Sequence, residues 1–190
     1  ATRVGVGGAG RVEFLLELDL NYYFSEMKTR IQVEHPVTEQ VTGIDLVQEQ
    51  IRVAAGAPLR YRQEDVRING HCIECRINAE DPVTYFPSLG RIERLGFPGG
   101  PGVRLDVALY RGLEVTPYYD SMLGKLIVFA ADREQAIARC IRALRELRIV
   151  GVLTSLPVAM RTLQSQEFVS GNYDTSILER IDTTSFAHKE

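Results

Sequence analysis

The stretch EMKTRIQVEHPVTE, residues 26–39, is the most distinctive part of this 190-residue sequence. It places three glutamates, a lysine, an arginine, a glutamine and a histidine within one short segment, with single apolar residues between them. The residues just before it, 21–27, alternate aromatic and polar side chains as a β-strand does. We therefore expect the end of a strand to deliver these charged side chains into a cleft.

A second strand pattern precedes this one. Residues 11–18 and 21–27 flank the dipeptide Asp19-Leu20, which predicts an antiparallel hairpin with a short loop. The hairpin would bring Glu13 and Glu26 face to face. Two carboxylates in that position repel each other unless a cation lies between them, and hard oxygen ligands suit Mg²⁺ or Mn²⁺. The alternative is a pair of solvent-facing glutamates on an edge ribbon.

The composition is that of a globular protein of one or two domains, with 45% hydrophobic and 25% charged residues. A net charge of −3 and the lack of a Lys/Arg-rich block argue against binding to nucleic acid or to a membrane surface. The apolar runs, such as residues 126–131, are too short to span a bilayer. We expect a soluble, cytoplasmic protein, or one of the mitochondrial matrix if the source is eukaryotic.

The three cysteines do not form a disulfide framework. Cys72 and Cys75 form a C-x-x-C, but residues three apart on a strand point to opposite faces. We expect two unrelated strand cysteines rather than a metal site. The alternation predicts one face with Cys72, Glu74 and Arg76 and another with Ile73, Cys75 and Ile77.

The remaining patterns predict an α+β fold of antiparallel strands with packed helices. Helices are expected at residues 42–56 and 154–163, and a third after Asp132, which would cap it with Gln135. The buried stripe of that third helix would be Ile137, Cys140, Ile141, Leu144 and Leu147. Strands are expected at residues 71–79, 91–95, 103–106 and 125–131, with a loop at 117–124.

Segments along nearly the whole chain resemble the biotin carboxylase family, the component of acetyl-CoA and related biotin-dependent carboxylases that carboxylates biotin. They are GAGRVEFLL, RIQVEHPVTEQVTGIDLVQEQIRVAAG, GHCIECRINAEDP, PGGPGVR, PYYDSMLGKLIV and NYDTSILER. The resemblance implies an ATP-grasp enzyme that uses ATP and bicarbonate to carboxylate biotin on a carrier protein, through carboxyphosphate.

The resemblance covers only the C-terminal part of the family. It implies that residues 1–56 end the ATP-grasp region, that 57–184 form the biotin carboxylase C-terminal domain, and that 185–190 are a disordered tail. Because the family's N-terminal domain and nucleotide lid have no counterpart here, we expect the 190 residues alone to be inactive. The alternatives are a non-catalytic module for dimerisation or carrier docking, and another ATP-grasp carboxylase.

The family's site residues carry over by position. Glu13 and Glu26 match metal-bridging glutamates that serve the bound nucleotide, and Leu15 matches a residue near the adenine. Lys28 stands where the family usually has an asparagine that helps to hold the second metal, so its role as a ligand is in doubt. Leu20 likewise replaces an expected turn glycine.

The substrate-binding residues also match. Arg30, Gln32 and the backbone N–H of Val33 correspond to the bicarbonate-binding group, and Glu34 corresponds to the general base. Arg76 corresponds to the arginine that holds the biotin enolate. The glycine-rich stretch with Arg104 falls at the family's homodimer contact, and the implied partners are a biotin carboxyl carrier protein or domain and a carboxyltransferase component.

Overall fold

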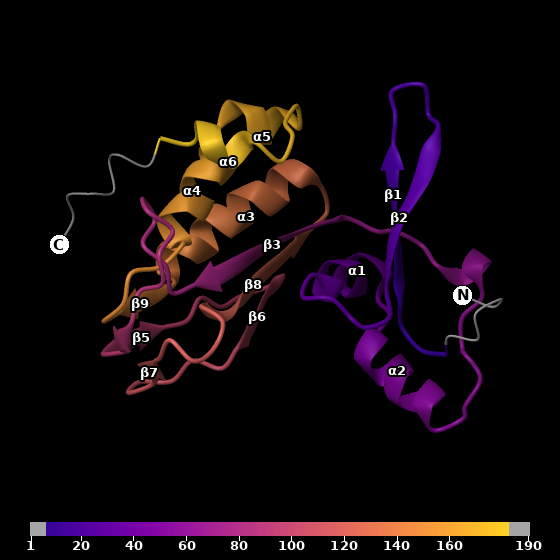
Figure 1. Cartoon of the computed structure of the whole chain (residues 1–190), viewed down its shortest axis with the longest axis horizontal. Helices are drawn as coiled ribbons and strands as arrows, with labels where there is room; N and C mark the ends of the chain where they lie inside the picture. The colour runs from indigo at the N-terminus through magenta and orange to yellow at the C-terminus, as the bar shows by residue number, and fades with distance from the viewer. Residues whose placement is uncertain (1–6, 183–190) are drawn as a thin grey trace. The chain divides into compact units, whose positions relative to one another are not determined.

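The computed structural model describes residues 7–182, so the predicted tail at 185–190 lies outside the described residues. The chain divides into two compact units, Ala1–Asn69 and Gly70–Glu190. Figure 1 shows a hairpin and short helices in the first unit, and a sheet with helices on it in the second. Each unit is described by itself below.

The first unit contains the hairpin that the sequence predicts. Strand β1 (Arg11–Leu16) pairs antiparallel with β2 (Tyr22–Lys28), and Glu13 stands directly opposite Glu26 in the register. The connecting loop holds Leu20 at φ +67°, in the left-handed region that glycine adopts more easily. Leucine therefore occupies the turn position with a conformation that costs it about 1–2 kcal/mol.

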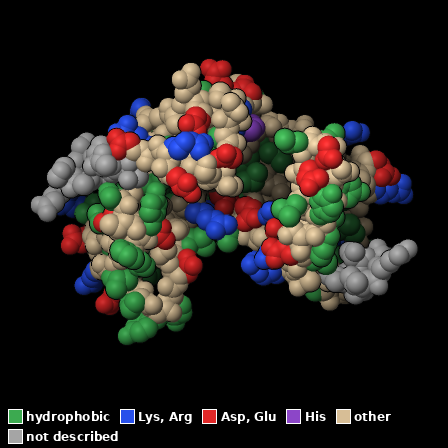
Figure 2. Space-filling view, turned by 45° about the horizontal axis from the view of Figure 1, so that its top comes forward, with side chains coloured by type: hydrophobic (Ala, Val, Ile, Leu, Met, Phe, Trp, Pro, Cys, Tyr) green, Lys and Arg blue, Asp and Glu red, His purple; other side chains and the backbone are tan. Residues whose placement is uncertain are grey.

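The hairpin carries many of its large apolar side chains on the surface. Leu15 and Leu16 are each 67% exposed, and Phe14 makes edge-to-face contacts with Tyr22 and Phe24. In the space-filling view, hydrophobic side chains reach the surface of the protein in several places among charges of both signs (Figure 2). The local aromatic contacts therefore supply part of the packing that holds this ribbon together.

Two helices follow the hairpin; the sequence analysis missed the first and placed the start of the second too early. Residues 26–39 are a strand only as far as Lys28, and helix α1 (His35–Thr42) begins within the segment. The predicted helix 42–56 is α2 (Leu46–Ala54), which starts later because Asp45 caps it by accepting a hydrogen bond from Gln48 N. Gly43, at φ +72°, ends α1 between them.

The second unit is built on an antiparallel sheet of order β3-β8-β6, which confirms the α+β prediction. Its strands are β3 (His71–Asn78), β8 (Met122–Ala130) and β6 (Val103–Val107). The predicted alternation in β3 is also confirmed, since Ile73, Cys75 and Ile77 are buried. Helices α3 (Arg133–Glu146) and α4 (Leu156–Gln164) cover that face (Figure 1).

Helix α3 forms where its cap predicts. The Asp132 carboxylate accepts hydrogen bonds from Gln135 N at 2.9 Å and from Gln135 Nε2 at 2.6 Å. Four of the five residues predicted for its stripe are buried, while Ile141 is partly buried against the core. Ala136 and Ala143 are fully buried as well, because small side chains let the helix approach the sheet closely.

Short elements complete the second unit and shift two predicted boundaries. The strand predicted at 91–95 is two strands, β4 (Gly90–Arg91), which pairs with β7 (Glu114–Val115), and β5 (Arg94–Gly96), which pairs with β9 (Arg148–Val150). Strand β8 begins three residues before the predicted start, inside the predicted loop 117–124. The remaining elements are the 3-10 helix η2 (Gln63–Asp65) of the first unit, and α5 (Gln166–Ser170) and α6 (Ile177–Arg180).

Gly124 explains why that loop prediction missed the start of β8. A Cβ atom at Gly124 would lie 2.8 Å from the Asp106 carbonyl oxygen, so glycine lets two strand backbones approach closely. Within residues 7–182, none of the helices has the length and apolar character needed to cross a membrane.

Candidate functional site

A cavity of about 410 Å³ in the first unit brings together side chains that the sequence predicts to bind bicarbonate. Arg30, Gln32 and Glu34 all line it, and Arg11 joins them. These side chains come from the start of β1, the turn after β2 and the start of α1. Two guanidinium groups, an amide and a carboxylate thus share one small cavity. The other lining residues are Ala9, Gly10, Ile31, His35, Thr38 and Leu46.

The turn after β2 places Glu34 at the N-cap of α1. Its side chain makes no capping hydrogen bond among the described residues, so the carboxylate is not committed to the helix end. The turn is held by His35, whose backbone N–H and ring Nδ1 both contact the carbonyl oxygen of Gln32, at 3.2 Å and 2.7 Å. His35 is therefore a structural residue.

Arg11 is a site residue that the sequence analysis missed. Its Nη1 forms an ion pair with Glu34 Oε1, and its Nε lies 3.4 Å from Glu13 Oε1. One guanidinium group therefore links the predicted base to a predicted metal ligand. A signal was present, because Arg11 and Glu13 are two residues apart on one strand and so share a face.

The hairpin brings the two predicted metal ligands together, but Lys28 is already bound to one of them. Lys28 Nζ lies 2.8 Å from Glu26 Oε2. That hydrogen bond is the main cause that lowers the pKa of Glu26, and the charge of Lys28, a hydrogen bond with Glu13 and the charge of Arg11 act in the same direction. The Lys28 ammonium group thus stabilises the ionised form of the Glu26 carboxylate.

The donor set fits one hard cation better than two. Glu13 and Glu26 offer carboxylate oxygens from opposite strands, which suits Mg²⁺ or Mn²⁺. Lys28 offers an ammonium group, which has no lone pair for a metal while it is protonated. In residues 7–182, no cluster of three or more His, Cys, Asp or Glu side chains could hold a metal ion.

Arg30 and Gln32 make different contacts within the cavity. Arg30 Nη1 donates to the carbonyl oxygen of Ile31 at 3.0 Å, which holds the start of the turn. Gln32 Oε1 is buried and has no hydrogen-bond partner in the described part of the chain. A buried acceptor without a partner costs about 1–3 kcal/mol, so an O–H or N–H group of a ligand would stabilise it.

The remaining residues predicted for the first unit occupy two places. Leu15 lies on β1 opposite Tyr23, with its side chain largely exposed, so it provides an apolar surface on the hairpin. Val33 follows Gln32 in the turn that leads to α1. Its backbone N–H therefore belongs to the same loop as the cavity residues.

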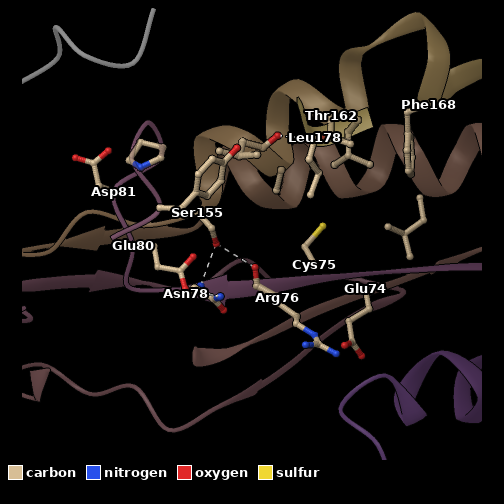
Figure 3. Close-up of a pocket in the computed structure, with 16 residues that line it drawn as sticks. Glu74, Cys75, Arg76, Asn78, Glu80, Asp81, Ser155, Thr162, Phe168 and Leu178 are labelled. Carbon is tan, nitrogen blue, oxygen red and sulfur yellow. Dashed lines mark hydrogen bonds between the residues drawn. The ribbon is translucent and has the colours of Figure 1, made fainter. Parts of the chain in front are cut away.

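Arg76 belongs to the second unit and lies on β3. Its backbone carbonyl accepts a hydrogen bond from Ser155 Oγ at 3.2 Å, which fixes the strand. Figure 3 shows the Arg76 and Glu74 side chains on the face of β3 opposite to that of Cys75. The register sets Arg76 opposite Lys125 on β8.

The same charged face of the sheet continues onto β6. Arg104 forms a two-pronged ion pair with Asp106, with Nε–Oδ1 and Nη2–Oδ2 distances of 2.8 Å each. Lys125 Nζ lies 3.7 Å from Asp106 Oδ2, and Lys125 is only 8% exposed. Arg104 is therefore held in a defined orientation by its own strand.

Two family models match this chain. Residues 74–180 match the biotin carboxylase C-terminal domain, and residues 1–62 match the ATP-binding domain of the carbamoyl-phosphate synthase L chain. The division between the two matches lies near the division between the compact units. The first match alone covers more than half of the chain.

Individual relatives agree with these matches. The chain is 52% identical over 184 residues to biotin carboxylase 1 of Bacillus subtilis (strain 168). The matched region covers 96% of this chain and 41% of that protein. It is 51% identical over 178 residues to the biotin carboxylase of Allochromatium vinosum, covering 94% of this chain and 39% of the relative. The chain thus spans about two fifths of the length of these relatives.

A solved structure gives the same result. The biotin carboxylase domain dimer of Hydrogenobacter thermophilus 2-oxoglutarate carboxylase, in complex with MgADP, ADP and bicarbonate, is 51% identical and superposes with a TM-score of 0.88. The superposition covers 91% of this chain and 38% of that one. The fold and its order of elements are therefore those of that structure over the matched length.

Proposed function

Since this chain belongs to the biotin carboxylase family, we propose that it forms the bicarbonate- and biotin-handling part of an ATP-dependent biotin carboxylase. The observation that carries the proposal is the cavity in which Arg30, Gln32 and Glu34 meet, with Arg11 linking Glu34 to Glu13. This arrangement combines a site for a small anion with a base beside it.

The first step uses the cavity of the first unit. The Arg30 guanidinium, the Gln32 amide N–H and the Val33 N–H bind bicarbonate, with its hydroxyl group toward Glu34. Glu34 takes the bicarbonate proton, so that a bicarbonate oxygen attacks the γ-phosphorus of ATP. Carboxyphosphate and ADP are the products, and Arg11 positions the Glu34 carboxylate during this transfer.

The second step uses Arg76. Carboxyphosphate breaks down to CO₂ and phosphate, the released phosphate takes the proton from N1′ of biotin, and the resulting enolate attacks CO₂. The Arg76 guanidinium carries a permanent charge and stabilises the enolate oxygen as its negative charge develops. Ser155 holds the strand through the backbone carbonyl of Arg76, and Arg76 is exposed, so its side chain can reach a substrate.

The nucleotide and its metal would contact the hairpin. Glu13 and Glu26 would hold one divalent cation, which when bound neutralises charge on the phosphate groups of ATP. Leu15 would contact the adenine through its exposed side chain. The Glu26–Lys28 ion pair lets the ammonium group compensate part of the negative charge at this place.

The partners follow from the same assignment. Relatives include the small component of a 2-oxoglutarate carboxylase from Hydrogenobacter thermophilus and one component of a pyruvate carboxylase from Methanothermobacter thermautotrophicus, so each of these relatives is part of a larger carboxylase. We propose a homodimer that contacts through the segment containing Arg104, a biotinylated carrier protein or domain, and a carboxyltransferase component. The protein would act in the cytoplasm, or in the mitochondrial matrix of a eukaryote.

A chimera tests the proposed function. Residues 1–184 of this chain would replace the matching segment of Bacillus subtilis biotin carboxylase 1, its 52% identical relative. We expect bicarbonate-dependent ATP hydrolysis and carboxylation of free biotin, whereas the 190 residues alone should show neither. A folded chimera that shows neither activity would contradict the assignment. Turnover by the 190 residues alone would contradict the expectation that they are inactive without the rest of the enzyme.

The Glu26–Lys28 ion pair favours one second candidate, a module that retains the fold for dimerisation or carrier docking without catalysis. This second candidate predicts a chimera that folds and dimerises but binds Mn²⁺ poorly. The chimera assay therefore separates the two candidates.

The substitution Lys28→Asn should raise the affinity of the chimera for Mn²⁺ by about tenfold, because it removes a positive charge and adds an oxygen ligand. Titration of the Mn²⁺ electron paramagnetic resonance signal measures this without turnover. Lys28→Met is the matched control, since it removes the charge but adds no ligand, and should give a smaller gain. Unchanged affinity in both variants would show that Glu26 is not a metal ligand.

A further inference from the structure

Two buried thiols meet in the core of the second unit. Cys75 on β3 and Cys140 on α3 have their sulfur atoms 3.6 Å apart, although 65 residues separate them in the chain. Cys75 is 9% exposed and Cys140 is fully buried. Both are free thiols, as is Cys72. The strand and the helix therefore hold a thiol pair that plays no part in the proposed carboxylation.

One of these thiols can be reached from outside. Cys75 lines a cavity of about 390 Å³ between β3 and the helices that follow α3, together with Asn78, Ser155 and Phe168. Figure 3 shows the Cys75 sulfur pointing toward these helices, away from Glu74 and Arg76. Cys140 does not line the cavity. A small solute would therefore meet Cys75 first and find Cys140 directly behind it.

We propose that Cys75 and Cys140 are an oxidisable thiol pair, in which a small hydroperoxide entering the cavity converts the two thiols into a disulfide. The Cys75 sulfur attacks one peroxide oxygen, which breaks the O–O bond and gives a sulfenic acid and one water molecule from hydrogen peroxide. The Cys140 sulfur then attacks the Cys75 sulfur and displaces the hydroxyl group as a second water. The two thiols lose two electrons and two protons, and the peroxide gains them.

The order of attack follows from the surroundings of each sulfur. The hydrogen bond to Cys75, followed by burial, raises the pKa of the Cys140 thiol, which disfavours the thiolate form that attacks a peroxide. A disulfide needs a sulfur separation of about 2.05 Å, so the two side chains have about 1.5 Å to close. The reaction is slow at a buried thiol and needs peroxide in excess.

Cys72 provides the matched control. It lies two positions before Glu74 on the other face of β3, where burial and the Glu74 charge raise its pKa to about 11. It is half-buried, and its strand direction turns it away from Cys75. Cys72 should therefore take no part in the disulfide, although it is only three residues from Cys75.

The test treats the folded chain with excess hydrogen peroxide, then counts the free thiols under denaturing conditions and maps crosslinks in a non-reduced digest by mass spectrometry. We expect the three free thiols to fall to one, with a Cys75–Cys140 crosslink about 2 Da lighter than the two separate peptides. The variant Cys72→Ser should form the same crosslink, which assigns the bond to Cys75 because Cys72 lies in the same tryptic peptide.

Two further outcomes decide the proposal. In Cys140→Ala, Cys75 should be captured as a sulfenic acid by a dimedone-type probe, because no resolving thiol remains. The Cys72→Ser protein leaves the core intact, so it gives a result even if Cys140→Ala fails to fold. An absence of crosslink in folded Cys72→Ser protein, or a crosslink that forms only in denaturant, would overturn the proposal. It does not rest on the proposed function.

Discussion

Glu34→Gln is expected to lower kcat for bicarbonate-dependent ATP hydrolysis by the chimera about 100- to 10,000-fold, the range that loss of a general base produces. Glutamine keeps the size of the side chain and its place at the start of α1. It cannot accept the bicarbonate proton, and it cannot form the ion pair with Arg11. KM for bicarbonate should change much less than kcat, because Arg30 and Gln32 remain in the cavity.

The matched control is Glu64→Gln. Glu64 lies in η2 of the same unit, is largely exposed and forms a long ion pair with Arg62, at 3.9 Å. This control should leave both kcat and KM unchanged. If Glu34→Gln keeps kcat within about threefold of the parent chimera, Glu34 is a structural partner of Arg11 and the base is another residue.

Arg76→Lys is expected to separate the two halves of the reaction. Bicarbonate-dependent ATP hydrolysis should persist, because bicarbonate binds in the first unit, while carboxylation of biotin should fall about 100- to 1000-fold. Lysine keeps the charge but loses the planar guanidinium group, which can donate two parallel hydrogen bonds. Parallel assays of phosphate release and of labelled bicarbonate incorporation into biotin measure the two rates.

A matched variant is available on the same unit. Arg94→Lys changes an exposed arginine on β5 in the same chemical way and should alter neither rate. The hydrogen bond from the Ser155 hydroxyl group to the Arg76 backbone carbonyl does not depend on the Arg76 side chain, so the strand should survive the substitution. A parallel fall in both rates would assign Arg76 to bicarbonate chemistry or to stability instead.

Local patterns in the sequence determined much of the fold. The alternation on either side of Asp19-Leu20 predicted the hairpin and the pairing of Glu13 with Glu26. The alternation in residues 71–79 predicted which side chains of β3 are buried, and Asp132 predicted the start of α3. These features rest on interactions between residues close in sequence, or on one face of a single element, and a pattern records such interactions directly.

The sequence analysis misplaced the bounds of the helices in the first unit, where apolar spacing competed with the signals of residues that start or end a helix. Apolar spacing carried the predicted helix through residues 42–56, but Gly43 adopts a left-handed conformation and Asp45 starts a new helix. Pro36 sits in the first turn of α1, where a missing N–H costs nothing, although the segment had suggested an extended strand end. The periodicity of apolar residues did not locate this break, because it did not govern burial here: the buried residue of α1 is Pro36, and that of α2 is Glu49.

The sequence by itself thus determined the family, the hairpin, the alternating face of β3 and the capped helix α3. Only the tertiary structure decided which distant groups meet: Arg11 with Glu34, Lys28 with the Glu26 carboxylate, and Cys75 with Cys140. Such contacts depend on side-chain directions and on how a strand and a helix pack, neither of which leaves a fixed spacing in the sequence. For the segment 26–39, the sequence supplied the chemical groups, and the fold set the ion pairs that hold them.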